Sequence, residues 1–537
     1  MTLPRRLRTI GRSVSRETVA AWLGALASLG VAVLVYTRFS IDMLLNRDEG
    51  IYAYGGQQLT HGVAPYASIF DPKTPLATML SGLGAGIAHL VGGNDLYGIR
   101  MVFFACACLS AVAIYLLAAR IWHSVLAGVV SAVAFASFQG FARDAISGPD
   151  AKTPGVLVTI LCMWLLYRRQ WFWAGIAASL AFLDWQPFVF FAVAALLAPV
   201  LNSDAGRRLR SVAFAIGGLV LPLVLTVGYF VIAGAFGKFF ESTFDYPATG
   251  VARGPSMTLW ARIRHISSVV YEYYDHAVVF ATGLAALVVL AAVHLLHGRR
   301  DWRAAVRDPF ICVVVLTAAA EFGYACYDFQ SYPDVYPLIA YPALGLGGVA
   351  AALLTAFGSV RLRRLAIAAV LAATAAATTV TAVSYTRTRA NNHAYLAQRA
   401  QACAIDRILV PGTPLYAVGD PTPLVLTHRR NPDRFIYLDA GVAQWKLDHS
   451  SRGFADWITQ IRNSRTSVIV MMGWGPNPLR YQLAAILRAL GYRSGWLGFW
   501  YVFLDPGAWA RAESQGVDVS PSRSDVLLST DGEPLSC

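Results

Sequence analysis

Charged side chains are scarce in this sequence. Asp, Glu, Lys and Arg make up only 14% of the 537 residues, whereas hydrophobic residues make up 56%. Soluble globular proteins have about 25% charged residues, so this composition excludes an ordinary soluble enzyme. The chain is predicted to be an α-helical polytopic membrane protein.

The sequence lacks metal-binding cysteine motifs and nucleotide-binding loops. Its seven cysteines have no metal-ligand spacing, and most lie in or beside apolar segments, where cysteine behaves as a small hydrophobic residue. Only Cys403 and Cys537 remain as candidates for a disulfide. Gly82, Gly84 and Gly86 resemble a nucleotide loop superficially, but they follow no strand and lie in an apolar helix, which favours a role in helix packing.

A signal-peptidase site is also missing. The first apolar run, residues 19–37, is not followed by an A-x-A-like cleavage motif, and five arginines precede it: Arg5, Arg6, Arg8, Arg12 and Arg16. This pattern predicts a retained first membrane helix with a cytoplasmic N-terminus.

Eleven apolar runs are long enough, or nearly long enough, to cross a bilayer. They cover residues 19–37, 98–118, 124–141, 154–167, 171–184, 187–201, 211–233, 277–296, 309–327, 335–356 and 365–384. With the N-terminus in the cytoplasm, every arginine cluster between these runs falls on the cytoplasmic side. The net charge of +13 therefore indicates membrane orientation and not nucleic-acid binding.

The run at 76–91 is apolar but short. A crossing at this place would turn all later arginine clusters outward, so we predict a re-entrant or interfacial helix within a first external loop of residues 38–97. This topology places Asp48, Glu49, Arg143 and Asp150 on the same outer face.

After residue 384 the composition changes to that of a soluble protein. We predict a transmembrane catalytic domain over 1–384, an extracytoplasmic α/β domain over 385–506, and a disordered tail over 507–537. The predicted elements of the α/β domain are strands at 414–418, 435–438, 467–472 and 498–504 and helices at 454–464 and 479–490.

The outer face combines carboxylates with cations close to the lipid, where charged groups are usually functional. This mixture suits transfer of a sugar from a lipid phosphodiester. In this interpretation Asp48 is the general base, Lys73 and Arg143 stabilise the departing phosphate, and Asp150 orients the acceptor or the base. Glu49 belongs to the same catalytic group, and a single displacement would invert the anomeric centre.

Other interpretations of these residues stay open. Lys73 also suits contact with lipid headgroups, and Asp150 follows a Gly-Pro turn where it could cap the next helix. Asp48, Glu49 and Asp150 could supply oxygen ligands to a divalent metal. For the whole chain, the alternatives are a transporter or lipid flippase, and a noncatalytic membrane scaffold.

The order of these motifs resembles the GT-C superfamily, in particular the protein O-mannosyltransferases and the bacterial aminoarabinose transferases of lipid A. The resemblance rests on Arg47-Asp48-Glu49-Gly50, Asp71-Pro72-Lys73-Thr74-Pro75, Arg100, Arg143 and Pro149-Asp150, with a later Tyr332–Pro337 motif. It implies a polyprenyl-phosphate sugar donor, an active site on the non-cytoplasmic face, Asp48 as a catalytic residue, and no metal or other cofactor. Mannose and a pentose such as arabinofuranose both suit the family as the transferred sugar, and the acceptor is a glycan, a lipid or a protein. Thr74 and Asp334 depart from the family pattern.

Overall fold

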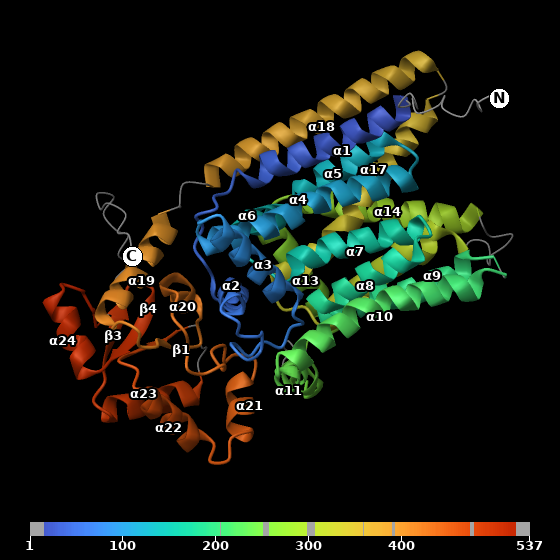
Figure 1. The fold of residues 1–537 in the computed structure, drawn as a ribbon. Coiled ribbons are helices and arrows are strands. Elements are labelled where there is room, and N and C mark those ends of the chain that lie inside the picture. Colours follow the sequence, from blue (N-terminus) through green and yellow to red (C-terminus); the bar gives the residue numbers. More distant parts are fainter. Residues whose placement is uncertain are drawn as a thin grey trace, which may run out of the picture.

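The structure is a computed structural model. It describes residues 16–204, 206–250, 257–297, 307–357, 359–388, 393–472 and 477–521. A long helical bundle makes up most of the molecule, and a small α/β module is attached at one end of it (Figure 1).

All eleven apolar runs predicted from the sequence are helical. The bundle consists of α1 (Arg16–Tyr36), α4 (Asp95–Ile121), α5 (Val125–Ala136), α6 (Gln139–Ser147), α7 (Lys152–Tyr167), α8 (Trp171–Asp184), η1 (Gln186–Phe188), α9 (Val189–Asn202), α10 (Arg208–Ile232), α14 (Ala277–His297), η4 (Phe310–Val315), α16 (Leu316–Tyr327), η5 (Tyr332–Ile339), α17 (Ala340–Ala356) and α18 (Val360–Thr388). Over the described residues, seven helical segments are long and apolar enough to cross a membrane, and α5 with α6 gives an eighth. The predicted number of eleven spans is therefore not confirmed.

The run at 124–141 is broken and not one straight helix. Its two parts, α5 and α6, meet at an angle of 73°. The break carries Phe138 into the core and turns α6, with Arg143 and Asp144, toward the end of the bundle that bears the module.

The first external loop contains two helices, α2 (Arg47–Thr60) and α3 (Leu76–Leu90). The 15 residues of α3 are too few to cross the hydrocarbon core, which requires about 20. The helix packs against α2 and α4 instead. Two of its predicted packing glycines touch neighbours: a Cβ at Gly82 would meet Leu59 of α2, and one at Gly84 would meet the backbone of Ile99 in α4. Gly86 faces open space.

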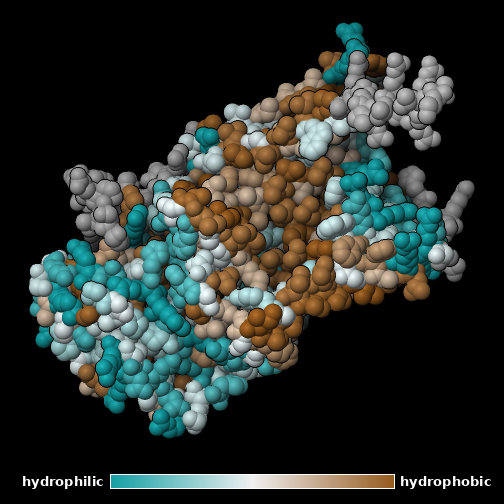
Figure 2. Space-filling model, in the orientation of Figure 1, coloured by the Kyte–Doolittle hydropathy of each residue, from teal (hydrophilic) through white to brown (hydrophobic). Residues whose placement is uncertain are grey.

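On the face of the molecule drawn in Figure 2, a hydrophobic belt covers the bundle and stops before the module. Figure 2 shows the belt as a brown band next to the largely hydrophilic surface of the module. Large apolar side chains such as Val224, Val278 and Val380 are exposed on it, as expected for a surface that contacts lipid. In Figure 1, α1, α10 and α18 all begin at the end of the bundle away from the module, so Arg208, Arg210, Arg361, Arg363 and Arg364 lie there.

A second long connection joins α10 to α14. It contains α11 (Phe236–Phe240), the π-helix η2 (Glu241–Asp245), α12 (Tyr246–Ala248) and α13 (Leu259–Tyr273). Tyr274, just after α13, is buried and donates a hydrogen bond to the carbonyl of Tyr332, so it belongs to the core and not to an interfacial surface.

The module is a four-stranded sheet between two layers of helices. The strand order is β1-β2-β4-β3, with β1 parallel to β2 and the other pairs antiparallel. Its elements are α19 (His393–Ile408), β1 (Tyr416–Val418), α20 (Thr422–Thr427), α21 (Val442–Asp448), α22 (Phe454–Ser464), β2 (Val468–Met471), α23 (Pro478–Ala489), β3 (Arg493–Leu497), β4 (Trp500–Leu504) and α24 (Pro506–Ser514).

The module differs from the sequence prediction in several details. Residues 435–438 form no strand, and β3 was not predicted. The predicted disordered tail is wrong at its start, because α24 is an ordered helix whose Ala508 and Ala512 are buried. Residues 522–537 of that tail lie outside the described residues. Cys403 is disulfide-bonded, and its predicted partner Cys537 also lies outside them.

The module and the first external loop share one hydrophobic core. Alternate residues of the sheet, including Val470 and Val502, pack in a cluster that also contains Ile51 and Tyr54 of α2. The other face of the sheet packs on α22 and α23. This shared core fixes the module against the first external loop.

Candidate active site

A polar cavity of about 340 Å³ lies where the first external loop, the bundle and the module meet. Its size is within the range of ligand pockets, which is roughly 300–1,000 Å³. Separate parts of the chain contribute to its wall, among them Asp48, Lys73, Asp150, Gln186, Tyr324 and Tyr437. Of the sequence-predicted site residues, the cavity thus brings together Asp48, Lys73 and Asp150.

Asp48 stands in the first turn of α2 and half of its side chain is exposed. The start of this helix is fixed by a capping box: Asn46 accepts a hydrogen bond from the Glu49 backbone, and the Glu49 carboxylate accepts one from the Asn46 backbone at 3.1 Å. Because the first turn also carries the positive end of the helix dipole, it stabilises a carboxylate at position 48.

Glu49 faces away from the cavity. It is buried, and its carboxylate packs so closely on Gly148 that a Cβ at that position would lie 2.2 Å from it. Burial raises the pKa of Glu49 and the nearby Asp144 raises it further, against the opposing charge of Arg100. Glu49 is not among the described residues that line the cavity.

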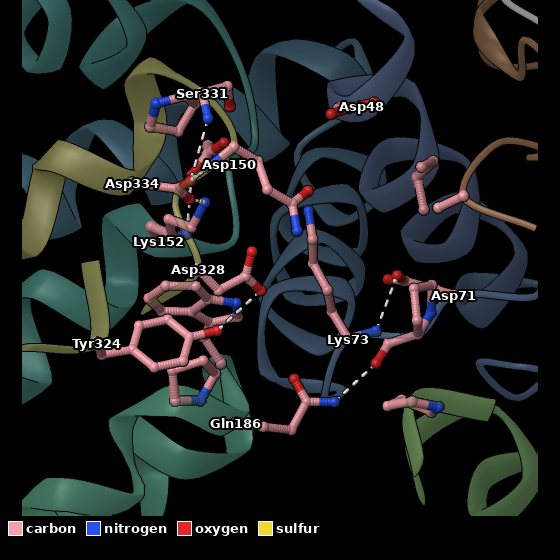
Figure 3. Close-up of a pocket in the computed structure, with 18 of the residues that line it drawn as sticks. Asp48, Asp71, Lys73, Asp150, Lys152, Gln186, Tyr324, Asp328, Ser331 and Asp334 are labelled. Atoms are coloured by element: carbon pink, nitrogen blue, oxygen red, sulfur yellow. Dashed lines mark hydrogen bonds and ion pairs between the residues drawn. The ribbon is translucent and has the colours of Figure 1, made fainter. Parts of the chain in front are cut away.

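Lys73 reaches into the middle of the cavity. Figure 3 shows its side chain between Asp71 on one side and Asp150 and Asp328 on the other. Its ammonium donates a hydrogen bond to the Tyr52 hydroxyl at 2.6 Å, so its bonded partner is a hydroxyl and not a carboxylate. Burial lowers the pKa of Lys73, but Tyr52 and the surrounding carboxylates raise it by more. The net shift is upward, so the amine keeps its proton.

Asp71 supports the loop that presents Lys73. Its carboxylate accepts a hydrogen bond from the Lys73 backbone at 3.1 Å, and the Lys73 carbonyl accepts one from Tyr66 at 2.8 Å. Burial raises the pKa of Asp71 to about 6, although the charge of Lys73 opposes the shift. Asp71 thus changes its charge within the range of pH at which proteins are usually assayed.

Asp150 both lines the cavity and shapes the start of α7. Its carboxylate accepts a hydrogen bond from the Lys152 backbone at 2.8 Å, in an Asx turn directly before the helix, whose N-cap is Ala151. Burial raises the pKa of Asp150, while Lys152 and Lys73 lower it. Asp150 is thus not the N-cap of α7, and its role in orienting the acceptor or the base stays a prediction.

Lys152 is neutralised inside the cavity wall. It forms a buried ion pair with Asp334, which also accepts hydrogen bonds from the backbones of Gln330 at 2.6 Å and Ser331 at 3.1 Å (Figure 3). The Lys152 ammonium lies 4.7 Å from the centre of the Trp185 ring. Lys152 therefore holds the α16–η5 loop in place.

Arg143 is placed beside the cavity and not on its described wall. It pairs with Asp144 at 3.0 Å and lies over the ring of Tyr332. Asp144 also accepts hydrogen bonds from Tyr332 and Tyr336. The predicted contact of Arg143 with phosphate stays a prediction.

Several lining residues were missed in the sequence. Four residues at the ends of predicted apolar runs line the cavity without having been assigned to the site: Gln186, Tyr324, Tyr327 and Asp334. Gln186 donates to the carbonyl of Pro72 at 2.7 Å and so links the bundle to the Lys73 loop. Their clustering on one face of the predicted topology was the available signal.

The module also lines the cavity, through Tyr437 and Ala440. Its 431–440 segment is bound to the membrane part by the ion pair of Arg47 with Asp439 and by a hydrogen bond from Tyr246 to Ala440. No sequence signal pointed to this contribution. Within the described residues, no group of three or more His, Cys, Asp or Glu side chains could hold a metal ion.

Known proteins share this fold and part of this sequence. A family model of dolichyl-phosphate-mannose-protein mannosyltransferase matches residues 73–230. ArnT from Cupriavidus metallidurans superposes with a TM-score of 0.60 at 16% identity in the apo state and 0.56 at 15% when bound to undecaprenyl phosphate, over 90% of this chain and 98% of ArnT. The apo oligosaccharyltransferase of Archaeoglobus fulgidus gives a TM-score of 0.54 at 14% identity, over 86% of this chain and 70% of that one. No curated protein sequence matches the chain. The chain thus has the fold of ArnT and of the archaeal oligosaccharyltransferase, and its residues 73–230 are similar in sequence to the mannosyltransferase family, in line with the GT-C resemblance of its motifs.

Proposed function

We propose that this protein transfers a single sugar from a polyprenyl-phosphate donor to an extracytoplasmic acceptor, with inversion at the anomeric carbon. The sugar is mannose or a pentose such as arabinofuranose, and the acceptor is a glycan, a lipid or a protein. The observation that carries the proposal is the convergence of Asp48, Lys73 and Asp150 on one cavity from three separate segments. The ArnT structure bound to undecaprenyl phosphate supports a donor of this kind.

In the proposed reaction, Asp48 takes the proton of the acceptor hydroxyl while that oxygen attacks the anomeric carbon of the sugar. The bond between the anomeric carbon and the phosphate oxygen breaks, and its electron pair leaves with the polyprenyl phosphate. The ammonium of Lys73 stabilises the leaving phosphate, and Asp150 orients the acceptor. One displacement needs no second nucleophile and inverts the anomeric centre.

The orientation in the membrane follows from the charges at the two ends of the bundle. The arginine-rich starts of α10 and α18 lie at the end away from the cavity (Figure 1). Because arginine is retained on the cytoplasmic side, the cavity and the module are proposed to face the other side. The hydrophobic surface of the bundle next to the module supports a position of the donor's lipid chain close to the cavity.

A reconstituted assay with radiolabelled polyprenyl-phosphate mannose and polyprenyl-phosphate arabinofuranose tests the proposal. We expect turnover with one donor, inverted products, and a loss in Asp48→Asn by a factor of roughly 100–10,000 at an unchanged melting temperature. Asp448→Asn, at an exposed site of the module, is the matched control. Turnover is expected to persist in EDTA, because Lys73 supplies the positive charge. Full activity of Asp48→Asn would contradict the assignment of the base.

A further inference from the structure

The module holds the start of α2 directly next to the proposed base. The buried side chain of Gln398 in α19 forms two hydrogen bonds with the backbone of Leu45, accepting at 3.1 Å and donating at 2.9 Å. Two residues later, Arg47 forms an ion pair with Asp439 of the module. Asp48 follows immediately. The first turn of α2 is therefore fixed from the module as well as by its own capping box.

Arg47 is shared between two carboxylates. Its Nε lies 3.3 Å from Oδ1 of Asp48, while its terminal nitrogen contacts Asp439. A strong hydrogen bond between a cation and a carboxylate is about 2.7–2.9 Å long, so the pairing with Asp48 is weak. The guanidinium also lies 4.8 Å from the centre of the Tyr437 ring, which holds its plane. Both residues that fix Arg47 from the far side thus come from the module.

We propose that Asp439 is a positioning residue of the glycosyl transfer, holding Arg47 so that the Asp48 carboxylate stays directed into the cavity and only weakly paired. This proposal rests on the proposed function, since it takes Asp48 as the base. It assigns the module a role in the chemistry. The module has no proposed catalytic residue of its own, but its Asp439 orients the arginine next to the base. Gln398 contributes the fixed backbone on which the arrangement depends.

The consequence of losing Asp439 follows from charge balance. In Asp439→Asn, the attraction of Arg47 shifts to Asp48, which turns the carboxylate toward the arginine and makes it a weaker base. The charged and titratable groups that face Asp48 from the surrounding elements are Arg47, Asp71, Lys73, Asp150, Tyr437 and Asp439. Of these, the substitution changes only Asp439.

We expect three changes in purified full-length Asp439→Asn. Turnover falls roughly tenfold, since small misplacements of a reacting group cost one to two orders of magnitude. The KM for the polyprenyl-phosphate sugar stays within about twofold, because the group that binds phosphate is untouched. The acid limb of the pH–rate profile moves to lower pH. Asp439→Glu, which keeps the charge, restores most of the rate.

A double-mutant cycle separates this role from a merely structural one. In an Arg47→Gln background Asp439 has no guanidinium to hold, so Asp439→Asn is expected to change neither the rate nor the pH profile further. Asp448→Asn is the control for loss of a carboxylate from the module. The melting temperature of each variant is measured in the same detergent.

The outcomes distinguish this proposal from the proposed function. If Asp48→Asn keeps its turnover, the base is wrongly assigned and the positioning role falls with it. If Asp48→Asn is inactive but Asp439→Asn has the rate and pH profile of the wild type, only the positioning role is overturned. The same holds if the effect of Asp439→Asn is as large in the Arg47→Gln background, or if Asp439→Glu is no better than Asp439→Asn.

Discussion

Lys73 and Lys152 line the same cavity but differ in the group to which each ammonium is bonded. Lys152 is paired with the buried Asp334, whereas Lys73 is bonded to the Tyr52 hydroxyl. Lys152→Met leaves a buried carboxylate without its cation and is expected to destabilise the protein by about 3–5 kcal/mol. Lys73→Met is expected to keep the melting temperature and to lower kcat/KM for the donor about a hundredfold. Thermal unfolding in detergent and steady-state kinetics measure both.

The pairing of Lys152 with Asp334 has its own control. Asp334→Asn in the Lys152→Met background removes the orphaned charge and keeps an acceptor for the backbones of Gln330 and Ser331. This double variant is expected to recover part of the lost stability. If it is as unstable as Lys152→Met alone, the loss comes from packing and not from the buried charge.

Asp71 makes the stability depend on pH in an unusual direction for a carboxylate. Its pKa in the folded protein is about 6, above the ordinary value of 3.8. The folded state therefore holds a proton that the unfolded chain releases, so this group destabilises the fold increasingly as pH rises from about 4 to about 7. Asp71→Asn, which keeps an acceptor for the Lys73 backbone, is expected to match the wild type near pH 4 and to exceed it at pH 8 by up to about 3 kcal/mol. A difference that is the same at both pH values would contradict the assignment.

For single residues, the sequence predicted which charged side chains of the loops belong to the site, but not which groups they bond to. Asp48, Lys73 and Asp150 were predicted to face one site because topology and motif order agree, and all three line the cavity. The distinction between Asp48 and its neighbour Glu49 depends on the direction of each side chain in the first turn of α2. That direction is set by the capping box and by Gly148, and a spacing of one residue does not reveal it.

The contact of α3 with α4 depends on one glycine of the 82–86 series. A Cβ at Gly84 would lie 2.6 Å from Cα of Ile99, a backbone atom that has no freedom to move aside. Gly84→Ala is expected to destabilise the protein by about 1–3 kcal/mol and to displace the Lys73 loop that precedes α3. Gly86→Ala, which meets open space, is the matched control and is expected to be neutral or stabilising by up to about 1 kcal/mol. Equal melting temperatures for the two variants would contradict this packing.

Element types were predictable where an apolar run is long and uniform. The predictions of element type failed where tertiary contacts determine the local structure. The 435–438 segment has the composition of a strand, but Phe70 and Phe435 stack at 5.0 Å and the Phe70 backbone bonds to the carbonyl of Arg434. These contacts hold the segment on the first external loop and not in the sheet. Likewise α24 is ordered because two small residues, Ala508 and Ala512, fit against the core of the module.

The whole molecule is organised by a core that crosses from the first external loop into the module. Composition changes sharply near residue 385, but the cluster around Trp500 and Val470 continues into Ile51 and Tyr54 of α2. No local pattern reveals such a junction, because each partner is an ordinary buried residue in its own element. The cavity depends on this junction, since Tyr437 reaches the wall only when the module is docked.

This arrangement gives a sharp prediction of orientation. Ser451 is exposed on the module, and Asp204 is exposed at the opposite end of the bundle, after α9. In a background in which the accessible native cysteines are replaced, Ser451→Cys is expected to react with an impermeant maleimide in intact cells. Asp204→Cys is expected to react only after the membrane is permeabilised, because the arginine-rich end is retained in the cytoplasm. The reverse pattern would place the cavity in the cytoplasm, where the proposed transfer to an extracytoplasmic acceptor has no route.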